Sequence, residues 1–153
     1  MMHIDRRKVA RLLLIGVVAI ASSVVARAEK VNKDSGDLAV HGYDLVGYFT
    51  ESRPVKGDSR FEHRINGARY LFASAANRDL FAKNPAAYLP QYGGFCAYGV
   101  SKGETPDIDP QAWKIVDGKL YLNYSPKVQK IWEGDIPGYV MKADRNWPKL
   151  NMP

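Results

Sequence analysis

Two dipeptides that favour tight chain reversal constrain the fold of this protein more than any other feature. Asn66-Gly67 separates "RFEHRI" from "ARYLFA", and Asp117-Gly118 separates "WKIV" from "KLYLNY". Asn-Gly and Asp-Gly are preferred in two-residue β-hairpin turns, because both turn positions need a positive φ. Apolar and charged side chains also alternate in the arm before Asn66, as in a half-buried strand. The sequence therefore predicts two antiparallel hairpins, at 60–73 and 113–124.

Helix-capping residues surround these hairpins. Asp44 and Ser74 each precede a segment with helical character, and Ser125 precedes Pro126 at the start of "KVQKIWEGD". A last helix is predicted over "PGYVMKADRNW", ending before Pro148, whereas "FCAYGV" has the alternation of a short strand. No repeat with the period of a solenoid or propeller is found. We expect an α+β fold, in which a small antiparallel sheet built from two hairpins carries several short helices.

The first residues have the layout of an export signal. A basic segment ending at Arg11 is followed by an uncharged apolar run, 12–26, and then by the small-x-small triplet ending at Ala28. The run is shorter than the ~20 residues that span a bilayer as a helix, so cleavage after Ala28 is preferred to a membrane anchor. The predicted organisation is a signal peptide at 1–28, a flexible leader at 29–37 and one domain at 38–150. A periplasmic or secreted location follows, by either the general or the twin-arginine route.

Net charge argues against a nucleic-acid partner. The whole chain carries 22 basic and 16 acidic side chains, but residues 1–28 hold five of the basic ones and one acidic. The remaining 17 and 15 nearly balance, and they form no cluster of Lys and Arg. We therefore expect no nucleic-acid partner, and no membrane contact after signal cleavage.

Three stretches resemble a known family. "GYDLVGYF", "FEHRINGARYLFASAANRDLFAKNPAAYLPQYGGFCAYG" and "DGKLYLNY" are similar to the YHS domain family, in its exported single-domain bacterial branch. The similarity covers about residues 38–125. It implies a small module of a kind that handles metal ions. In the metal-binding forms, cysteines stand in a "DPVCG" turn and in a "YFCS…C" segment. Here Gly47, Ala73 and Asn77 occupy those positions, so the family's metal ligands do not carry over.

Cys96 is the only cysteine of the chain, so no intramolecular disulfide can form. A thiolate would suit a soft ion such as Cu(I). A buried, unreactive thiol beside the Gly93-Gly94 turn is the alternative, since free cysteine is often buried. His41 is the second candidate ligand, because it lies in a glycine turn and imidazole is a common metal ligand. The sequence alone cannot place it near Cys96.

The leading hypothesis is an exported, non-catalytic binding module that binds a soft metal ion, with copper the expected ion and Cys96 and His41 its ligands. The alternative is a domain that binds a partner protein or a small ligand through an aromatic surface, with Cys96 structural. A third hypothesis, a thiol-dependent oxidoreductase, would require a lowered pKa at Cys96. No catalytic motif is present: the chain has no G-x-S-x-G, H-E-x-x-H, phosphate loop or Cys-x-x-Cys.

Overall fold

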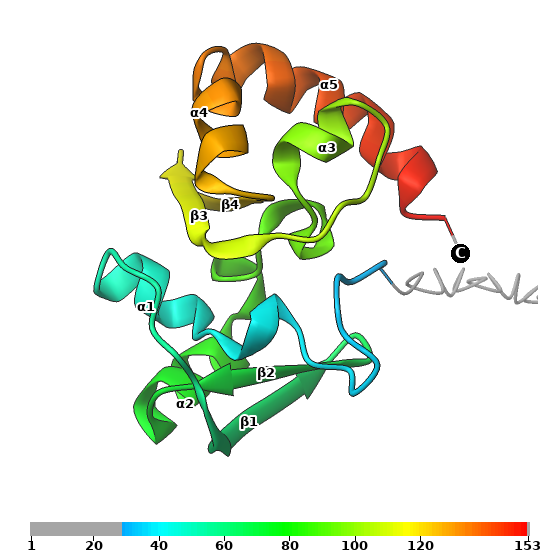
Figure 1. The fold of residues 1–153 in the computed structure, drawn as a ribbon. Helices are drawn as coiled ribbons and strands as arrows, with labels where there is room; N and C mark the ends of the chain where they lie inside the picture. Colours follow the sequence, from blue (N-terminus) through cyan, green and yellow to red (C-terminus); the bar gives the residue numbers. More distant parts are fainter. Residues whose placement is uncertain (1–28, 153) are drawn as a thin grey trace, which may run out of the picture.

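The computed structural model describes residues 29–152, so the predicted export signal at 1–28 lies outside the described residues. The chain forms two sets of elements, one above the other in Figure 1. The lower set comprises η1 (Val40–Gly42), α1 (Leu45–Thr50), β1 (Asp58–Ile65), β2 (Ala68–Phe72), α2 (Ala75–Lys83) and η2 (Pro85–Ala87). The upper set comprises η3 (Gln91–Gly94), α3 (Ala97–Ser101), β3 (Asp109–Val116), β4 (Lys119–Asn123), α4 (Pro126–Glu133) and α5 (Ile136–Leu150). The predicted α+β class is confirmed.

Both predicted hairpins are present. Ile65 pairs with Ala68 across the first turn, and Val116 pairs with Lys119 across the second. The central residues of both turns have positive φ, 53° and 71° in Asn66-Gly67 and 51° and 73° in Asp117-Gly118. The hairpins form two separate two-stranded sheets, whereas the sequence predicted that they would build one.

β4 contributes side chains to both hydrophobic clusters of the described structure, a lower one and an upper one. Leu120 and Leu122 point into the lower hydrophobic cluster with Phe72 and Phe81, while Tyr121 points into the upper cluster with Trp132. Four successive residues of β4 are buried, whereas buried and partly exposed residues alternate in β2. Because β4 contributes side chains to both clusters, the two sets of elements share their hydrophobic core.

The two sets are copies of one structural unit. The first hairpin pairs Asp58 with Phe72 and Glu62 with Leu71, with an irregularity between them. The second pairs Asp109 with Asn123 and Trp113 with Leu122, with the same irregularity, each residue lying 51 positions later. A short helix precedes each hairpin and another follows it. We call residues 40–83 the first unit and residues 92–133 the second unit.

The turn that opens each unit is also repeated. Val40, His41 and Gly42 have φ values of 53°, 50° and 79°, and the residues 52 positions later, Tyr92, Gly93 and Gly94, have 59°, 61° and 81°. In each unit a short helix follows: α1 in the first and α3 in the second. The prediction of a strand at "FCAYGV" is therefore wrong. Its alternation covers only a few residues, and Cys96 caps a helix there instead.

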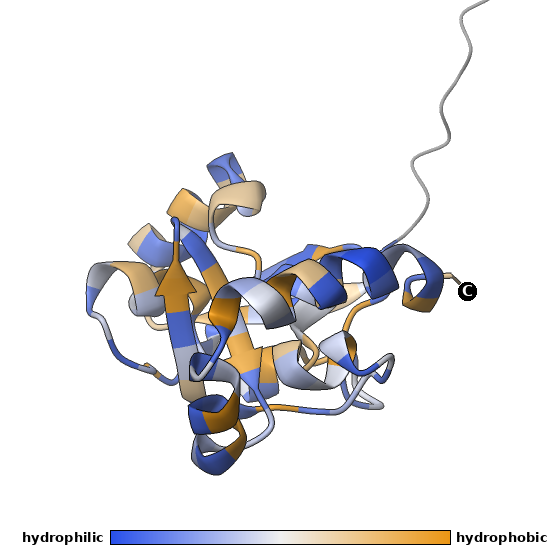
Figure 2. Cartoon of the chain, turned by 90° about the horizontal axis from the view of Figure 1, so that it is seen from above, coloured by the Kyte–Doolittle hydropathy of each residue, from blue (hydrophilic) through white to orange (hydrophobic). Residues whose placement is uncertain are grey.

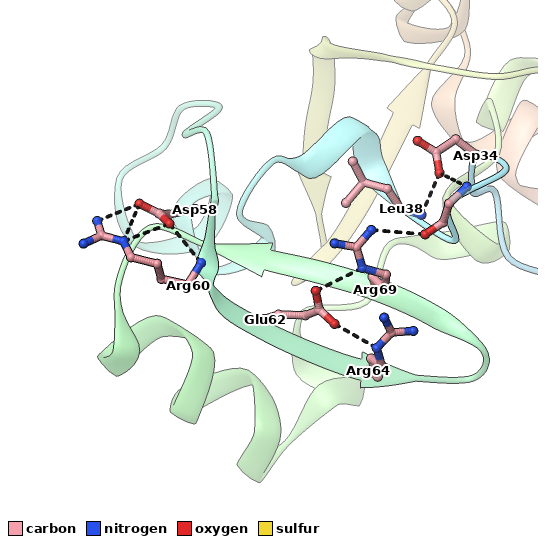
Figure 3. Close-up of polar contacts among 8 residues, drawn as sticks. Asp34, Leu38, Asp58, Arg60, Glu62, Arg64 and Arg69 are labelled. Carbon is pink, nitrogen blue, oxygen red and sulfur yellow. Dashed lines mark hydrogen bonds and ion pairs between the residues drawn. The ribbon is translucent and has the colours of Figure 1, made fainter.

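Residues 29–37, predicted to be a flexible leader, are hydrogen-bonded to both units. The Asn32 amide donates to the Gly93 carbonyl at 2.9 Å. The Arg69 guanidinium donates to the Gly36 carbonyl at 3.1 Å and to Glu62 at 3.0 Å, and Figure 3 shows this link between the leader and the first hairpin. Backbone groups of residues 29–37 thus tie this segment to both units.

The last helix extends further than predicted, because α5 continues through Pro148 to Leu150. Proline removes one backbone donor and disfavours a helix interior, but only Lys149 and Leu150 follow it in α5, and this end of the helix is packed. Trp147 supplies the packing through Tyr92 and Phe95. Figure 2 shows hydrophilic and hydrophobic residues alternating along α5, in keeping with its single buried residue, Ala143. In residues 29–152, no helix is both long and apolar enough to cross a bilayer.

Candidate functional site

Cys96 is buried, with 1% of its surface exposed, and lies at the N-terminus of α3. Its sulfur accepts hydrogen bonds from the amides of Gly99 at 3.4 Å and Tyr124 at 3.2 Å. The thiol lies 3.6 Å from Asn123 Oδ1, to which it donates. The sulfur therefore joins the start of α3 to the end of β4.

Burial raises the pKa of the Cys96 thiol, although the nearby Gly99, Tyr124 and Tyr98 amides act in the opposite direction. The thiol therefore stays protonated at neutral pH. Since the thiolate is the nucleophile and the usual metal-binding form, this direction argues against the thiol-dependent oxidoreductase.

Asp44 has the corresponding place in the first unit, and its predicted capping role is confirmed. It is fully buried and accepts four hydrogen bonds. Oδ1 accepts from the amides of Val46 at 2.8 Å and Gly47 at 3.2 Å, and Oδ2 accepts from the Ala73 amide at 2.9 Å and from Asn77 Nδ2 at 2.8 Å. One carboxylate thus joins α1, the end of β2 and α2.

The second unit divides this role between two side chains. Cys96 accepts from Gly99 and Tyr124, the counterparts of Gly47 and Ala73. The Tyr98 amide, the counterpart of the Val46 amide, donates instead to Asn123 Oδ1 at 3.1 Å. Cys96 and Asn123 together therefore accept the three backbone hydrogen bonds whose counterparts Asp44 accepts alone.

A hollow of about 270 Å³ lies beside Cys96. It is bounded by α3, the turn after it, the residue after β4 and the start of α4. Its lining consists of Cys96, Tyr98, Gly99, Lys102, Glu104, Pro106, Tyr124 and Val128. Val128 is the counterpart of Asn77, whose amide reaches Asp44 in the first unit. The aliphatic side chain has no such polar group, and it borders the hollow instead.

Two charged residues stand at the hollow on one turn. The amides of Lys102 and Glu104 both donate to the Gly99 carbonyl, at 2.9 and 3.0 Å. Between them Gly103 has φ 84°, a conformation that favours glycine. Lys102 Nζ lies 5.3 Å from the Tyr98 ring centroid and 5.5 Å from that of Tyr139. The backbone thus places Lys102 and Glu104 two residues apart at the hollow, and the Lys102 ammonium group lies near two aromatic rings.

His41 lies elsewhere, at a separate and smaller cavity of about 70 Å³. Its Nε2 is 3.0 Å from Asp107 Oδ1, which also accepts from Asn32 Nδ2 at 2.9 Å. Partial burial of Asp107 acts to raise its pKa, but hydrogen bonds from Asn32, the Ile108 amide and His41 hold that pKa below its usual range. His41 therefore joins the first unit to the segment before β3.

The two predicted metal ligands do not line a common cavity. Cys96 lines the hollow, and His41 lines the smaller cavity with Asp107. Within residues 29–152, no group of three or more His, Cys, Asp and Glu side chains is placed to hold a metal ion. Metal binding through Cys96 and His41 stays a prediction.

Sequence reasoning did not single out Lys102, Glu104, Asn123 or Val128. The signal that would have found them is the weak repeat itself: "GYDLVGY" against "GFCAYGV", and "NGARYLFAS" against "DGKLYLNYS". Aligned in this way, Asp44 stands opposite Cys96 and Asn77 opposite Val128.

Comparison of the chain with known protein families, curated proteins and solved structures finds no match. Within residues 29–152, the fold is that of a two-unit α+β domain, and the hollow beside Cys96 lies in the second unit.

The capping role of Cys96 predicts a graded response to substitution. Cys96→Ser keeps an acceptor for the Gly99 and Tyr124 amides, so we expect it to change the free energy of unfolding by less than about 1 kcal/mol. Cys96→Ala removes the acceptor and leaves two buried donors unpaired, at a cost of about 1–3 kcal/mol. Urea denaturation of both variants measures the difference. Equal stability of the two variants would contradict the capping role.

Proposed function

We propose that this protein is an exported, non-catalytic binding module, similar to YHS domains, that takes a small ligand in the hollow beside Cys96. The observation that carries the proposal is the hollow itself, walled by Tyr98 and Tyr124 and of about 270 Å³. Small-molecule sites are concave and mostly apolar, with a few polar groups that orient the ligand. This volume lies just below the usual range for drug-sized ligands and suits a small molecule.

The tyrosines support a binding role. Tyr124 is 59% exposed, although large aromatic side chains usually gain more from burial. Tyr98 is partly buried and packs edge-on against Tyr139, with ring centroids 5.2 Å apart. Tyrosine is enriched at binding surfaces because it combines apolar area with a hydroxyl group. Cys96 is structural in this proposal.

An NMR experiment tests the proposal. The mature protein, residues 29–153, is mixed with a library of small polar and amphiphilic compounds, and amide shifts are followed. We expect bound compounds to shift the amide resonances of Tyr98, Lys102 and Tyr124. We expect Tyr124→Ala to lower the affinity for these compounds at least about tenfold. Met141→Ala is the matched control, because Met141 is 50% exposed but lies outside the hollow lining. A library that binds nowhere near the hollow would refute the proposal.

Soft-metal binding is the second candidate, and one observation favours it. Cys96, a soft sulfur donor, lines the hollow. Two backbone amides already occupy its lone pairs, so a metal ion would have to displace them. Cu(I) titration against a competing chelator, with wild type, Cys96→Ser and His41→Ala, separates the candidates. Equal affinities in all three would exclude both residues as ligands.

A further inference from the structure

We infer that the ligand of the hollow is a small zwitterion with an apolar body, such as an aliphatic α-amino acid. The inference rests on the proposed function and names the ligand class of the same site. Its basis is the pair Lys102 and Glu104, the two charged residues in the lining of the hollow.

Neither of these charges has an ion-pair partner among the residues that the structure describes. Both side chains belong to exposed residues, yet the backbone fixes their turn through the Gly99 carbonyl. The ammonium group of Lys102 is further held near two aromatic rings. The protein thus presents a cation and an anion two residues apart on an ordered turn, and neither is taken up by an ion pair with the described residues.

Charge complementarity selects the ligand class. A simple carboxylate would pair with Lys102 but would be repelled by Glu104, and a simple amine would meet the reverse. A molecule with both groups pairs its carboxylate with Lys102 and its ammonium group with Glu104. The remaining lining residues, Tyr98, Pro106, Tyr124 and Val128, offer mostly apolar or aromatic surface to an aliphatic body.

The two-unit comparison supports a ligand in the second unit alone. Lys102 and Glu104 follow α3, whereas in the segment after α1 the opposite charges of Glu51 and Arg53 already pair with each other at 3.2 Å. Asn77 binds Asp44 where Val128 borders the hollow. In the first unit these polar groups therefore pair with each other. In the second unit Lys102 and Glu104 stand at the hollow without an ion-pair partner among the described residues.

Three matched probes test the inference: L-leucine, 4-methylpentanoate, which lacks the amino group, and 3-methylbutylamine, which lacks the carboxylate. Binding to the mature protein is measured from NMR shifts at Tyr98, Lys102 and Tyr124. We expect L-leucine to bind more tightly than either single-charge probe by about two- to fivefold, the range typical of exposed ion pairs. Lys102→Gln should lower the affinity for L-leucine and leave that for 3-methylbutylamine equal or higher. Glu104→Gln should likewise lower the affinity for L-leucine and leave that for 4-methylpentanoate equal or higher.

The outcomes separate the inference from the function on which it rests. If either single-charge probe binds as well as L-leucine, or the two variants fail to discriminate, the zwitterion inference is overturned while the hollow remains a binding site. If L-leucine and its analogues do not bind but other compounds shift the amide resonances of residues at the hollow, the inference alone fails. If no compound shifts these residues, the proposed function fails as well. Lys102→Gln and Glu104→Gln alter exposed side chains, so unchanged thermal unfolding is the control for folding.

Discussion

Replacing Asp44 by alanine is expected to lower the free energy of unfolding by about 3–5 kcal/mol, a large part of the stability of a domain of this size. The carboxylate is fully buried and accepts four hydrogen bonds, three from backbone amides and one from Asn77. Alanine leaves those buried donors unpaired, and an unsatisfied buried polar group costs about 1–3 kcal/mol. Urea denaturation followed by circular dichroism measures the loss.

Asp135→Ala is the matched control for this prediction. Asp135 also caps a helix, but it is exposed and accepts from one amide, that of Gly138, at 3.0 Å. Loss of such a cap costs about 0.5–2 kcal/mol. Asp44→Asn, which keeps the shape and one carbonyl acceptor, should fall between wild type and Asp44→Ala. Similar losses for Asp44→Ala and Asp135→Ala would mean that Asp44 is an ordinary cap and does not join three elements.

Trp132→Ala is the second substitution with a large expected effect, about 3–5 kcal/mol. Trp132 is fully buried at the centre of the upper cluster and packs on Tyr121, with ring centroids 5.3 Å apart. We expect a single unfolding transition for the whole chain, because β4 contributes side chains to both clusters. Thermal unfolding followed by near- and far-ultraviolet circular dichroism tests both the size and the cooperativity.

The neighbouring Ile131→Ala is the control, since Ile131 lies on the same helix and is 45% exposed. Its substitution should cost less than about 1 kcal/mol. Trp132→Phe should cost less than Trp132→Ala. It retains most of the ring, supplies the residue type of its counterpart Phe81, and removes an indole N–H that has no partner in the described structure. Two separate transitions for Trp132→Ala would show that the two units unfold independently.

The contrast between the units bears on the proposed function. A repeated fold offers two equivalent places for a site, and in the first unit Asp44 and Asn77 fill that place with internal hydrogen bonds. In the second unit the thiol and an aliphatic residue border a hollow. A structural network therefore fills this place in the first unit. Ligand binding is proposed for its counterpart in the second unit.

Local signals in the sequence predicted the elements they control. The Asn66-Gly67 and Asp117-Gly118 turns and the caps at Asp44, Ser74 and Ser125 are all present. Each depends on the backbone preferences or hydrogen bonds of a few adjacent residues, so no distant part of the chain is needed to form it. The strand prediction at "FCAYGV" was wrong because a run of six residues fits both the period of a strand and the period of a helix. There, tertiary contacts with Pro106 and Tyr124 decided in favour of a helix.

The location of the candidate site could not be predicted from the sequence, for a physical reason. Cys96 and His41 were chosen by residue type, but which cavity each side chain lines depends on packing between segments far apart in the chain. The hollow takes its walls from α3, the turn after it, the residue after β4 and α4.

By itself, the sequence determined the α+β class, the two hairpins and most helix starts, because turn conformation and capping are local properties of the backbone. The tertiary structure alone decided that the hairpins form separate sheets, that β4 lies between two hydrophobic clusters, and that Cys96 takes the structural place of Asp44. These features arise from burial and hydrogen bonding between residues about 30 to 50 positions apart, which no local pattern specifies.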